Sequence, residues 1–405
     1  MNSFLNNFIN RRNIYLDYAS TTPVAPEVVR AMRPYLTEQF FNPSSSYMDA
    51  QKVKKEIRAH RVEIARMFQS KDSEVIFTQG GTESNNLAIL GLARHAVEHV
   101  DFKPHMLFSE IEHPAVSECI PVLKKMGIDI DIVLVNERGT LDTQDLEKKL
   151  TERTILISVI MVSNEIGTIQ PIHKVSSLIK RYKNKLKRPF TQYPFIHTDA
   201  SQAMLTEDVG MSKLGVDMIS IDGSKIYAPK MTGLLIRKQH VPLEPLIYGG
   251  GQEFGLRSGT ENASGIIGLS VALALTKTSK ERDTKYFENL RAVFLDELSK
   301  TGIAYELNGN ESARVPHILN ICIQRLNSDF AVIQLDELGV NCSAMTACAS
   351  AKGTPKSQVI EAIGKPECAA SSLRFSFGRN TTVNEVKKAV RLLAAVCRKQ
   401  NIDSI

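Results

Sequence analysis

Two residues of this chain have side chains suited to a reaction in which an amine forms a Schiff base with a carbonyl group. Lys225 stands in "ISIDGSKIYAPKMTGLLI", just past one buried apolar stretch and before another. A lysine that loses hydration there becomes a usable nucleophile, although a lone lysine more often reaches out to water. Asp199 ends the apolar stretch of "FIHTDASQA", where a carboxylate can hold a protonated ring nitrogen. A Schiff-base lysine combined with such an aspartate is the requirement of pyridoxal 5′-phosphate (PLP).

A phosphate-binding turn should then exist, and "FTQGGTESNN" supplies one. Gly80 and Gly81 follow an apolar stretch, and Thr82 is expected to cap the helix that starts there. Backbone N–H groups and the positive end of the helix would meet a phosphate. Two glycines can occur at any turn from a strand to a helix, so the pattern alone is weak evidence for a phosphate site. Together with Lys225 and Asp199 it becomes stronger evidence.

Three further segments place polar groups where strands are expected to end. His113 in "SEIEHPAV" can stack on a ring and move protons, or can be a capping or core histidine. Asn164 and Glu165 in "MVSNEIGTIQP" follow a very apolar strand, with a polar turn as the alternative. Arg374 lies inside the apolar "SSLRFSFGR" and needs an anionic partner. A substrate carboxylate and a structural salt bridge explain Arg374 equally well.

The pattern of hydrophobic residues predicts the strands and helices on which these residues lie. Seven short apolar runs begin near positions 74, 105, 131, 155, 195, 217 and 233. Most are continuously apolar, as expected of strands covered on both faces. Helix-like segments alternate with them, which predicts a mostly parallel α/β sheet with ligands at the carboxyl ends of the strands.

The length of 405 residues predicts two domains. After about residue 265 the pattern changes to a long helix, a few strands and a final amphipathic helix from Asn384. We therefore expect a large domain over 15–265 and a smaller α+β domain over 266–405, against which residues 1–14 can also pack.

The composition and the sequence pattern indicate where the protein is located and which partners it does not bind. No apolar run is long enough to span a bilayer, and the N-terminus lacks a secretory signal, so we expect a cytoplasmic protein without membrane contact. The net charge is +6, and the basic run "IKRYKNKLKRP" from Ile179 is expected to be a solvated helix face and loop. Few aromatics accompany it, so no nucleic-acid binding is expected.

The six cysteines show neither a disulfide framework nor metal-type spacing, and no metal site is expected. Two of them, Cys342 and Cys348, lie among small residues in "VNCSAMTACASAKGTP". The other four are expected to be buried, unreactive thiols: Cys119, Cys322, Cys368 and Cys397.

Taken together and in this order, these segments resemble the cysteine desulfurases of the class V aminotransferase family (the NifS/IscS type). The resemblance covers nearly the whole chain, through "IYLDYASTTPV", "FFNPSSSY", "GGTESNNLAI", "EIEHPAV", "SNEIGTIQPI", "HTDASQA", "SKIYAPKMTGLL", "GGGQEFGLRSGT" and "SSLRFSFGR". It implies a two-domain, PLP-dependent fold type I enzyme that works as a homodimer with active sites at the subunit interface.

The resemblance also implies roles for single residues. Lys225 matches the Schiff-base lysine, His113 the ring-stacking acid/base and Asp199 the partner of the pyridine nitrogen. The other cofactor positions are Gln202 at the ring hydroxyl, Gly81, Thr82, Asn164, Asp222 and Ser224, with Thr260 reaching the phosphate from the other subunit. Arg374, Asn164 and Asn42 match positions that hold the carboxylate of the substrate.

The same resemblance separates the two remaining cysteines. Cys348 aligns with the nucleophile that takes sulfur from L-cysteine as a persulfide, leaving L-alanine, and Cys342 is expected to be buried behind it. A loop of small residues suits a thiol that must travel, and Lys352 would help the thiolate form. The sulfur would then pass to an acceptor protein for iron–sulfur cluster assembly, tRNA thiolation or DNA phosphorothioation.

Three features depart from the family pattern. "SGHK" of the family is "DGSK" here, so that Asp222 and Ser224 replace a serine and a histidine that contact the phosphate. An ionised Asp222 would repel a phosphate, and we expect weaker cofactor retention. Met345 replaces a glycine of the cysteine loop, and the chain stops at Ile405, which favours a specialised sulfur acceptor.

Two other functions compete with this interpretation. One is a related lyase or transaminase acting on selenocysteine or another amino acid, against which Cys348 argues. The other is an impaired paralogue that serves as a sulfur carrier or assembly subunit. Retention of the catalytic set argues against the paralogue: Lys225, His113, Asp199, Arg374 and Cys348.

Overall fold

A computed structural model of the chain describes residues 13–189, 191–344 and 356–402. Its main feature is a seven-stranded sheet in the order β2-β8-β7-β6-β5-β3-β4. All neighbours are parallel except β8, which runs antiparallel to β7 and β2. The strands match the seven predicted runs: β2 Val75–Thr78, β3 His105–Ser109, β4 Asp129–Val133, β5 Thr154–Ser158, β6 Phe195–Asp199, β7 Met218–Asp222 and β8 Gly233–Arg237.

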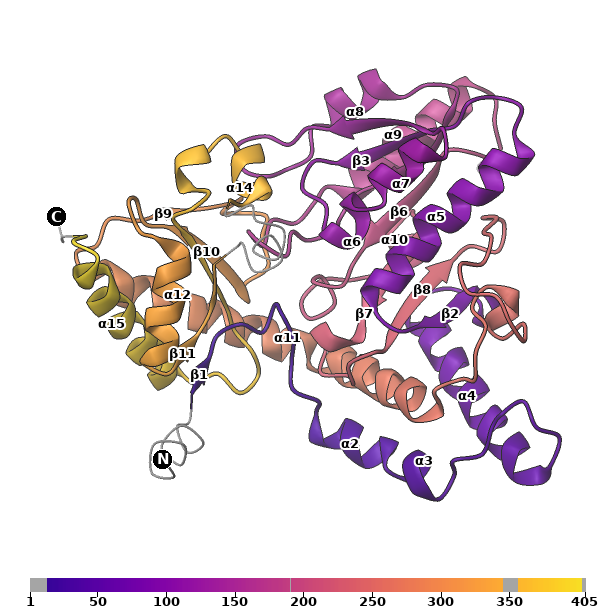
Figure 1. Cartoon of the computed structure of the whole chain (residues 1–405), viewed down its shortest axis with the longest axis horizontal. Coiled ribbons are helices and arrows are strands. Elements are labelled where there is room, and N and C mark those ends of the chain that lie inside the picture. The colour runs from indigo at the N-terminus through magenta and orange to yellow at the C-terminus, as the bar shows by residue number, and fades with distance from the viewer. Residues whose placement is uncertain (1–12, 190, 345–355, 403–405) are drawn as a thin grey trace.

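Helices cover this sheet and explain its continuously apolar strands (Figure 1). One of those packed directly on it is α5 (Gly81–His99), which contacts β7 and β8. The others in this half of the chain are α2 Pro26–Met32, α3 Pro34–Thr37, α4 Met48–Met67, α6 Pro114–Ser117, α7 Ile120–Lys125, α8 Thr143–Lys149, α9 Ile172–Lys185 and α10 Met211–Leu214, with 3-10 turns at Asp72–Glu74, Gly223–Lys225 and Glu253–Gly255.

The predicted cap of α5 is wrong by two residues. Gly80, not Thr82, is the N-cap residue, and no side chain caps this end. Gly80 has φ +128°, a conformation that favours glycine, and a Cβ on Gly233 would lie only 2.6 Å from the Gly80 backbone. The close approach of β8 to this turn therefore decides where the helix begins, and a local cap signal does not contain that information.

A second, smaller sheet has the order β12-β13-β10-β9 and is antiparallel throughout. Its strands are β9 Glu306–Leu307, β10 Ile318–Cys322, β12 Ser343–Ala344 and β13 Ser372–Ser376. With it lie α12 Ser328–Glu337, α14 Gln358–Ala362, the 3-10 turn Pro366–Cys368 and the predicted final helix, α15 Val383–Lys399. The first strand of the described chain belongs to this region, since β1 (Ile14–Tyr15) pairs in parallel with β11 (Val340–Asn341).

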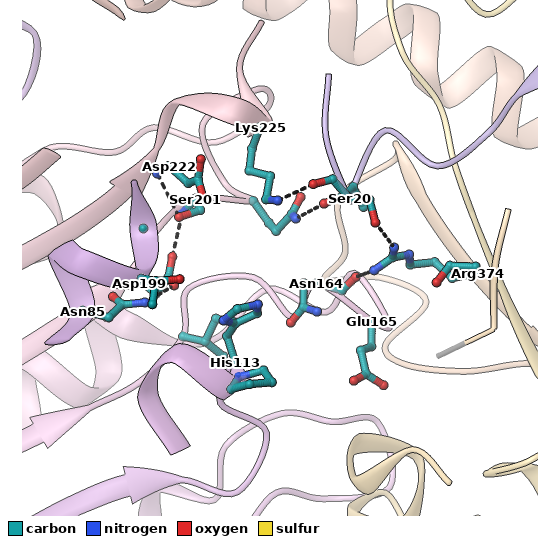
Figure 2. Close-up of a pocket in the computed structure, with 17 residues that line it drawn as sticks. Ser20, Asn85, His113, Asn164, Glu165, Asp199, Ser201, Asp222, Lys225 and Arg374 are labelled. Atoms are coloured by element: carbon teal, nitrogen blue, oxygen red, sulfur yellow. Dashed lines mark hydrogen bonds between the residues drawn. The ribbon is translucent and has the colours of Figure 1, made fainter. Parts of the chain in front are cut away.

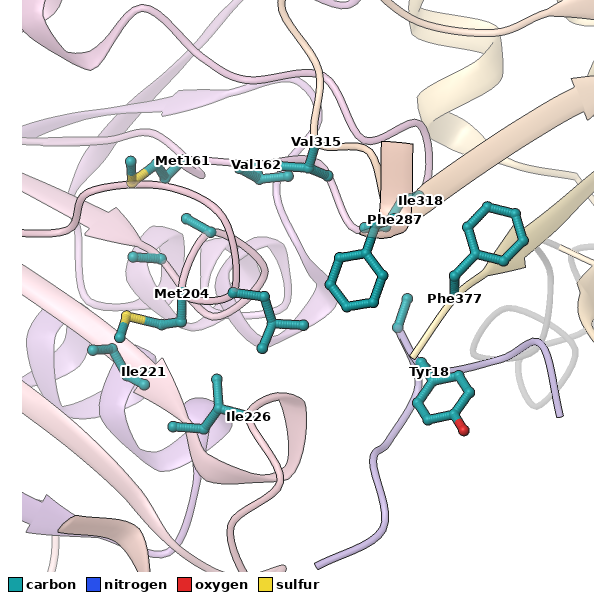
Figure 3. Packing of buried hydrophobic residues seen from close by; sticks show 14 of the residues in the cluster. Tyr18, Met161, Val162, Met204, Ile221, Ile226, Phe287, Val315, Ile318 and Phe377 are labelled. Atoms are coloured by element: carbon teal, nitrogen blue, oxygen red, sulfur yellow. The ribbon is translucent and has the colours of Figure 1, made fainter. Parts of the chain in front are cut away.

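One long helix joins the two regions. α11 (Ala263–Ser299) packs against α2, α4 and α15, and in Figure 1 it runs from the region of the large sheet to that of the small one. A single hydrophobic core continues across this boundary, from Met204 and Ile226 to Phe287, Ile318 and Phe377 (Figure 3). The division at residue 265 stays a prediction, because the two regions share this core.

The cysteine prediction needs a correction. Cys322 and Cys368 form a disulfide that links β10 to the turn Pro366–Cys368, and both are fully buried. They are 46 positions apart in sequence, and only the folding of this region brings their Cα atoms to 5.5 Å. Cys119, Cys342 and Cys397 are buried free thiols, as predicted.

Among the described residues, no helix is long and apolar enough to cross a membrane. The same residues contain no group of histidine, cysteine and acidic side chains that could hold a metal ion.

Candidate active site

A cavity opens at the carboxyl edge of the large sheet, where β5, β6 and β7 end, and is closed by β13 of the small sheet (Figure 2). Most of the predicted site residues line it: Gly81, Thr82, His113, Asn164, Asp199, Gln202, Asp222, Lys225 and Arg374. Side chains from more than 200 positions of sequence therefore meet at one place.

Asp199 lies at the end of β6 and is 6% exposed. Its Oδ2 accepts a hydrogen bond from Asn85 Nδ2 at 2.7 Å, and its Oδ1 accepts one from the Ser201 amide at 2.9 Å. Both donors compensate a buried negative charge. This carboxylate is thus held in place for a cationic partner in the cavity.

His113 faces Asp199 and Lys225 across the cavity (Figure 2). Its Nδ1 accepts a hydrogen bond from the Ala115 amide at 3.0 Å, which caps α6. The proton of the neutral imidazole therefore lies on Nε2. Burial lowers the pKa of His113, while the charge of Asp199 opposes this shift. The neutral imidazole can therefore donate its Nε2 proton and take it back.

Lys225 ends the 3-10 turn that follows β7, and its amine donates a hydrogen bond to the Ser20 carbonyl. In Figure 2 the amine points into the space between Ser20 and Asp222. Gln202, which also lines the cavity, donates to the Ala19 carbonyl at 2.8 Å. The segment 19–20 thus closes one side of the cavity over the lysine.

The contacts of Arg374 agree in part with both roles predicted for it, a structural salt bridge and a binding site for the substrate carboxylate. Its Nη2 forms an ion pair with Asp17 at 2.7 Å, and its Nη1 donates to the Asn164 carbonyl at 2.9 Å. The residue is 5% exposed and lines the cavity, and its Nε has no hydrogen-bond partner among the described residues. A structural salt bridge is present, and the guanidinium is still placed to meet an anion.

The opposite end of the cavity is formed by the start of α5. There Asp222 accepts a hydrogen bond from the Ser224 amide at 2.8 Å and caps the 3-10 turn. A Cβ built on Gly81 would lie 3.1 Å from the Asp222 Cβ and 3.4 Å from its Oδ2. The N-terminus of α5, which suits a phosphate, therefore already has a carboxylate beside it.

These residues fit PLP, with one opposing charge. The buried Asp199 suits a protonated pyridine nitrogen, the Lys225 amine suits the aldehyde carbon, and the glycine turn leaves room for a phosphate. Asp222 is the residue that opposes the phosphate.

Three predicted residues lie elsewhere. Asn42 is exposed and its Oδ1 accepts from the Ser44 amide. Ser224 does not line the cavity, and Thr260 is exposed in a separate groove with Gln79. Residues 345–355, with Met345, Cys348 and Lys352, lie outside the described part of the chain, so the roles assigned to them stay predictions.

Several cavity residues were not predicted. Ser20, Asn85, Ser201 and Ser343 line the cavity, and Asp17 holds Arg374. Asn85 lies three positions after Thr82 and so on the same helix face, a signal that was available. Ser20 and Asp17 come from the start of the chain, whose place beside the small sheet is a tertiary feature.

Two carboxyls near the cavity have raised pKa values. Burial raises the pKa of Glu112 to about 8, against the hydrogen bond that its Oε1 accepts from the Ile160 amide at 2.6 Å. Burial also raises the pKa of Glu165 to about 7, although the Ser357 hydroxyl and the charge of Arg374 lower it. Both carboxyls therefore carry a proton for part of the neutral range.

The sheet, its edge cavity and the lysine, aspartate and histidine define a PLP-dependent enzyme of fold type I. The chain belongs to the class-V aminotransferase family, which matches residues 14–389, and within it to the cysteine desulfurases. It is 38% identical to the cysteine desulfurase IscS of Dictyoglomus turgidum over 96% of this chain and 95% of the relative.

Solved structures agree with this family. A NifS-like protein superimposes with a TM-score of 0.87 at 28% identity, covering 96% of this chain and all of the other. SspA in complex with cysteine superimposes with a TM-score of 0.76 at 31% identity, covering 90% of this chain and 98% of the other.

Proposed function

We propose that this chain is a cysteine desulfurase that converts L-cysteine to L-alanine and carries the sulfur on Cys348 before an acceptor protein takes it. The observation that carries the proposal is the meeting of Lys225, His113, Asp199 and Arg374 on one cavity. The IscS relative, a cysteine desulfurase that is similar over 96% of this chain, supports the proposal.

PLP, when bound, supplies an electron sink that makes the Cα–H bond of an amino acid acidic. Asp199 would hold the protonated ring nitrogen of the bound cofactor, and the Lys225 amine would hold its aldehyde carbon. The guanidinium of Arg374 binds the substrate carboxylate next to the Asn164 carbonyl. Lys225 and the Nε2 of His113 then hold and return the protons of the reaction.

The Cys348 thiolate attacks the sulfur of the substrate, so that the Cβ–S bond breaks and an S–S bond forms. The bonding electrons of the Cβ–S bond stay with the carbon fragment, which takes up protons and leaves as L-alanine. An acceptor thiol then attacks the outer sulfur of the persulfide. The acceptor serves iron–sulfur cluster assembly or nucleic-acid thiolation.

The assembly and setting follow from the family resemblance. The active form is a cytoplasmic homodimer in which Thr260 of one subunit reaches the phosphate site of the other. The exposed position of Thr260, outside the cavity of its own chain, supports this arrangement.

The test is product analysis of the PLP-loaded protein incubated with L-cysteine and a thiol reductant. We expect L-alanine and sulfide in equal amounts, and neither product from the Lys225→Ala variant. Pyruvate and ammonia instead of alanine would show a lyase of the same superfamily. No turnover with cofactor bound would favour the impaired paralogue.

A further inference from the structure

Glu165 is a cavity residue to which the mechanism above gives no task. It lines the cavity next to Asn164, yet in Figure 2 its carboxylate turns away from Lys225 and His113. Its Oε2 accepts a hydrogen bond from the Ser357 hydroxyl at 2.6 Å. The partner comes from the small sheet's side of the molecule, 192 positions along the chain.

Ser357 is the N-cap residue of α14, in the region of the small sheet. It is 2% exposed, and its hydroxyl oxygen accepts from the Ile360 amide at 3.1 Å, which caps α14. The hydroxyl therefore donates to Glu165 and accepts from α14 at the same time. The Ser357 amide in turn donates to the Ala369 carbonyl at 3.2 Å. Glu165 thus contacts the hydroxyl that caps the start of this helix.

The backbone around Glu165 joins the same two regions. The Glu165 carbonyl accepts from Asn320 Nδ2 of β10 at 3.2 Å, and the preceding carbonyl accepts from Arg374. The next residue, Ile166, is fully buried and packs in one apolar cluster with Val359 and Ile360 of α14. The carboxylate is therefore held at a fixed place relative to the cavity wall.

Ser357 lies only nine positions after Cys348 in the sequence, so its contact with Glu165 lies close to the cysteine segment. Residues 345–355, which include Cys348, are bounded by Ala344 on one side and by Lys356 and Ser357 on the other. The first boundary is held by backbone pairing, since Ala344 lies opposite Leu373 of β13. At the second boundary the side-chain link to the cavity wall is the Glu165 carboxylate.

We propose that Glu165 is a positioning residue for sulfur transfer: acting through Ser357, its carboxyl fixes the start of α14 against the cavity, directly after the segment 345–355 that carries Cys348. This inference rests on the proposed desulfurase function. It assigns Glu165 no contact with the substrate. The carboxyl acts on the step that needs Cys348 and leaves substrate binding to Arg374.

The test compares persulfide formation on Cys348 with L-cysteine binding in the PLP-loaded protein. We expect Glu165→Ala to slow persulfide formation about tenfold, while the L-cysteine concentration for half-maximal spectral change moves less than twofold. Glu165→Gln should keep the wild-type rate, because its amide oxygen still accepts from Ser357. Ser357→Ala should match Glu165→Ala, and the double variant should be no slower than either.

A matched control is Asn327→Ala, which removes the side-chain cap of α12 in the same region without contact to Glu165. It should leave the persulfide rate unchanged. An equal loss in Asn327→Ala would reduce the Ser357 effect to general cap loss. Independent, multiplying losses in the two single variants would also overturn the proposal, as would weaker L-cysteine binding with an unchanged persulfide rate.

Amide hydrogen exchange separates this proposal from the proposed function. Exchange over residues 358–363 should be faster in Glu165→Ala than in wild type, without any substrate added. If the wild-type protein formed no persulfide, the desulfurase function would fail, and the exchange comparison would still decide whether Glu165 holds α14. Unchanged exchange in Glu165→Ala contradicts the proposal whatever the activity.

Discussion

The two ends of the cavity are built differently. At the ring end, Asp199 has two donors, His113 has a defined tautomer, and Lys225 has a backbone partner. At the phosphate end, the start of α5 offers a positive helix end, but the Asp222 carboxylate lies beside it. We infer that the ring end carries the groups for ring binding and proton transfer, whereas the Asp222 carboxylate is expected to weaken the hold on the cofactor's phosphate.

This comparison separates two kinds of variant. Changes at the ring end should reduce turnover and leave cofactor affinity nearly unchanged. Changes at the phosphate end should alter cofactor affinity and leave turnover at saturating cofactor nearly unchanged.

Asp199→Asn should have the largest effect, because it keeps the size of the side chain and removes the charge that faces the ring nitrogen. We expect the turnover of L-cysteine to fall about 1,000-fold. Steady-state alanine release measures it, and an absorbance titration with PLP should show affinity within threefold of wild type. Turnover within tenfold of wild type would contradict the role of Asp199.

His113→Asn should lower turnover about 100-fold, the scale of one acid/base group. Asparagine is a good N-cap residue, so the cap of α6 is retained and the loss reports proton transfer. The measurement is alanine release against pH. A loss below fivefold across the pH range would show that proton transfer does not depend on His113. The ring end would then lack the acid/base group assigned to it.

Glu112→Gln should change the pH dependence of stability. The folded protein holds a proton on Glu112 up to a pKa of about 8, whereas the unfolded chain releases it near 4.5. The free energy of unfolding therefore falls as pH rises between these values and levels off above them. We expect the wild type to lose about 4 kcal/mol more than the variant between pH 5 and 9.

Thermal unfolding of both proteins at pH 5 and pH 9 provides the measurement for Glu112. The glutamine can still accept from the Ile160 amide, so the two proteins should unfold alike at pH 5. Parallel losses of stability in wild type and variant would show that Glu112 is not the proton holder.

Asp222→Asn should strengthen PLP binding about tenfold, since it removes a like charge beside the phosphate and keeps the cap of the 3-10 turn. The readout is the dissociation constant from an absorbance titration. Asp142→Asn is the matched control, because Asp142 caps α8 in the same way away from the cavity. Unchanged affinity in Asp222→Asn, or a change in turnover alone, would break the comparison.

Sequence reasoning went furthest where function depends on local pattern. The seven strands follow from continuous apolar runs, and the strand ends place Asp199, Asn164 and Lys225 at one edge of the sheet. The departure at Asp222 was also visible from the sequence. Its position beside Gly81 needed the structure.

What the sequence missed depends on contacts between distant segments. The Cys322–Cys368 disulfide, the Asp17–Arg374 ion pair and the Glu165–Ser357 hydrogen bond each join parts of the chain that no periodicity connects. The cap of α5 was misplaced for the same reason, because β8 fixes it through Gly80. Such contacts are set by how the two sheets pack.

The most direct test of the proposed function is to find where sulfur from L-cysteine goes. The PLP-loaded protein is incubated with L-cysteine without reductant, digested and mapped by mass spectrometry. We expect one added sulfur atom on the Cys348 peptide and none on Cys342, because burial raises the pKa of the Cys342 thiol to about 12. Sulfur on Cys342, or no added sulfur with cofactor bound, would contradict this prediction.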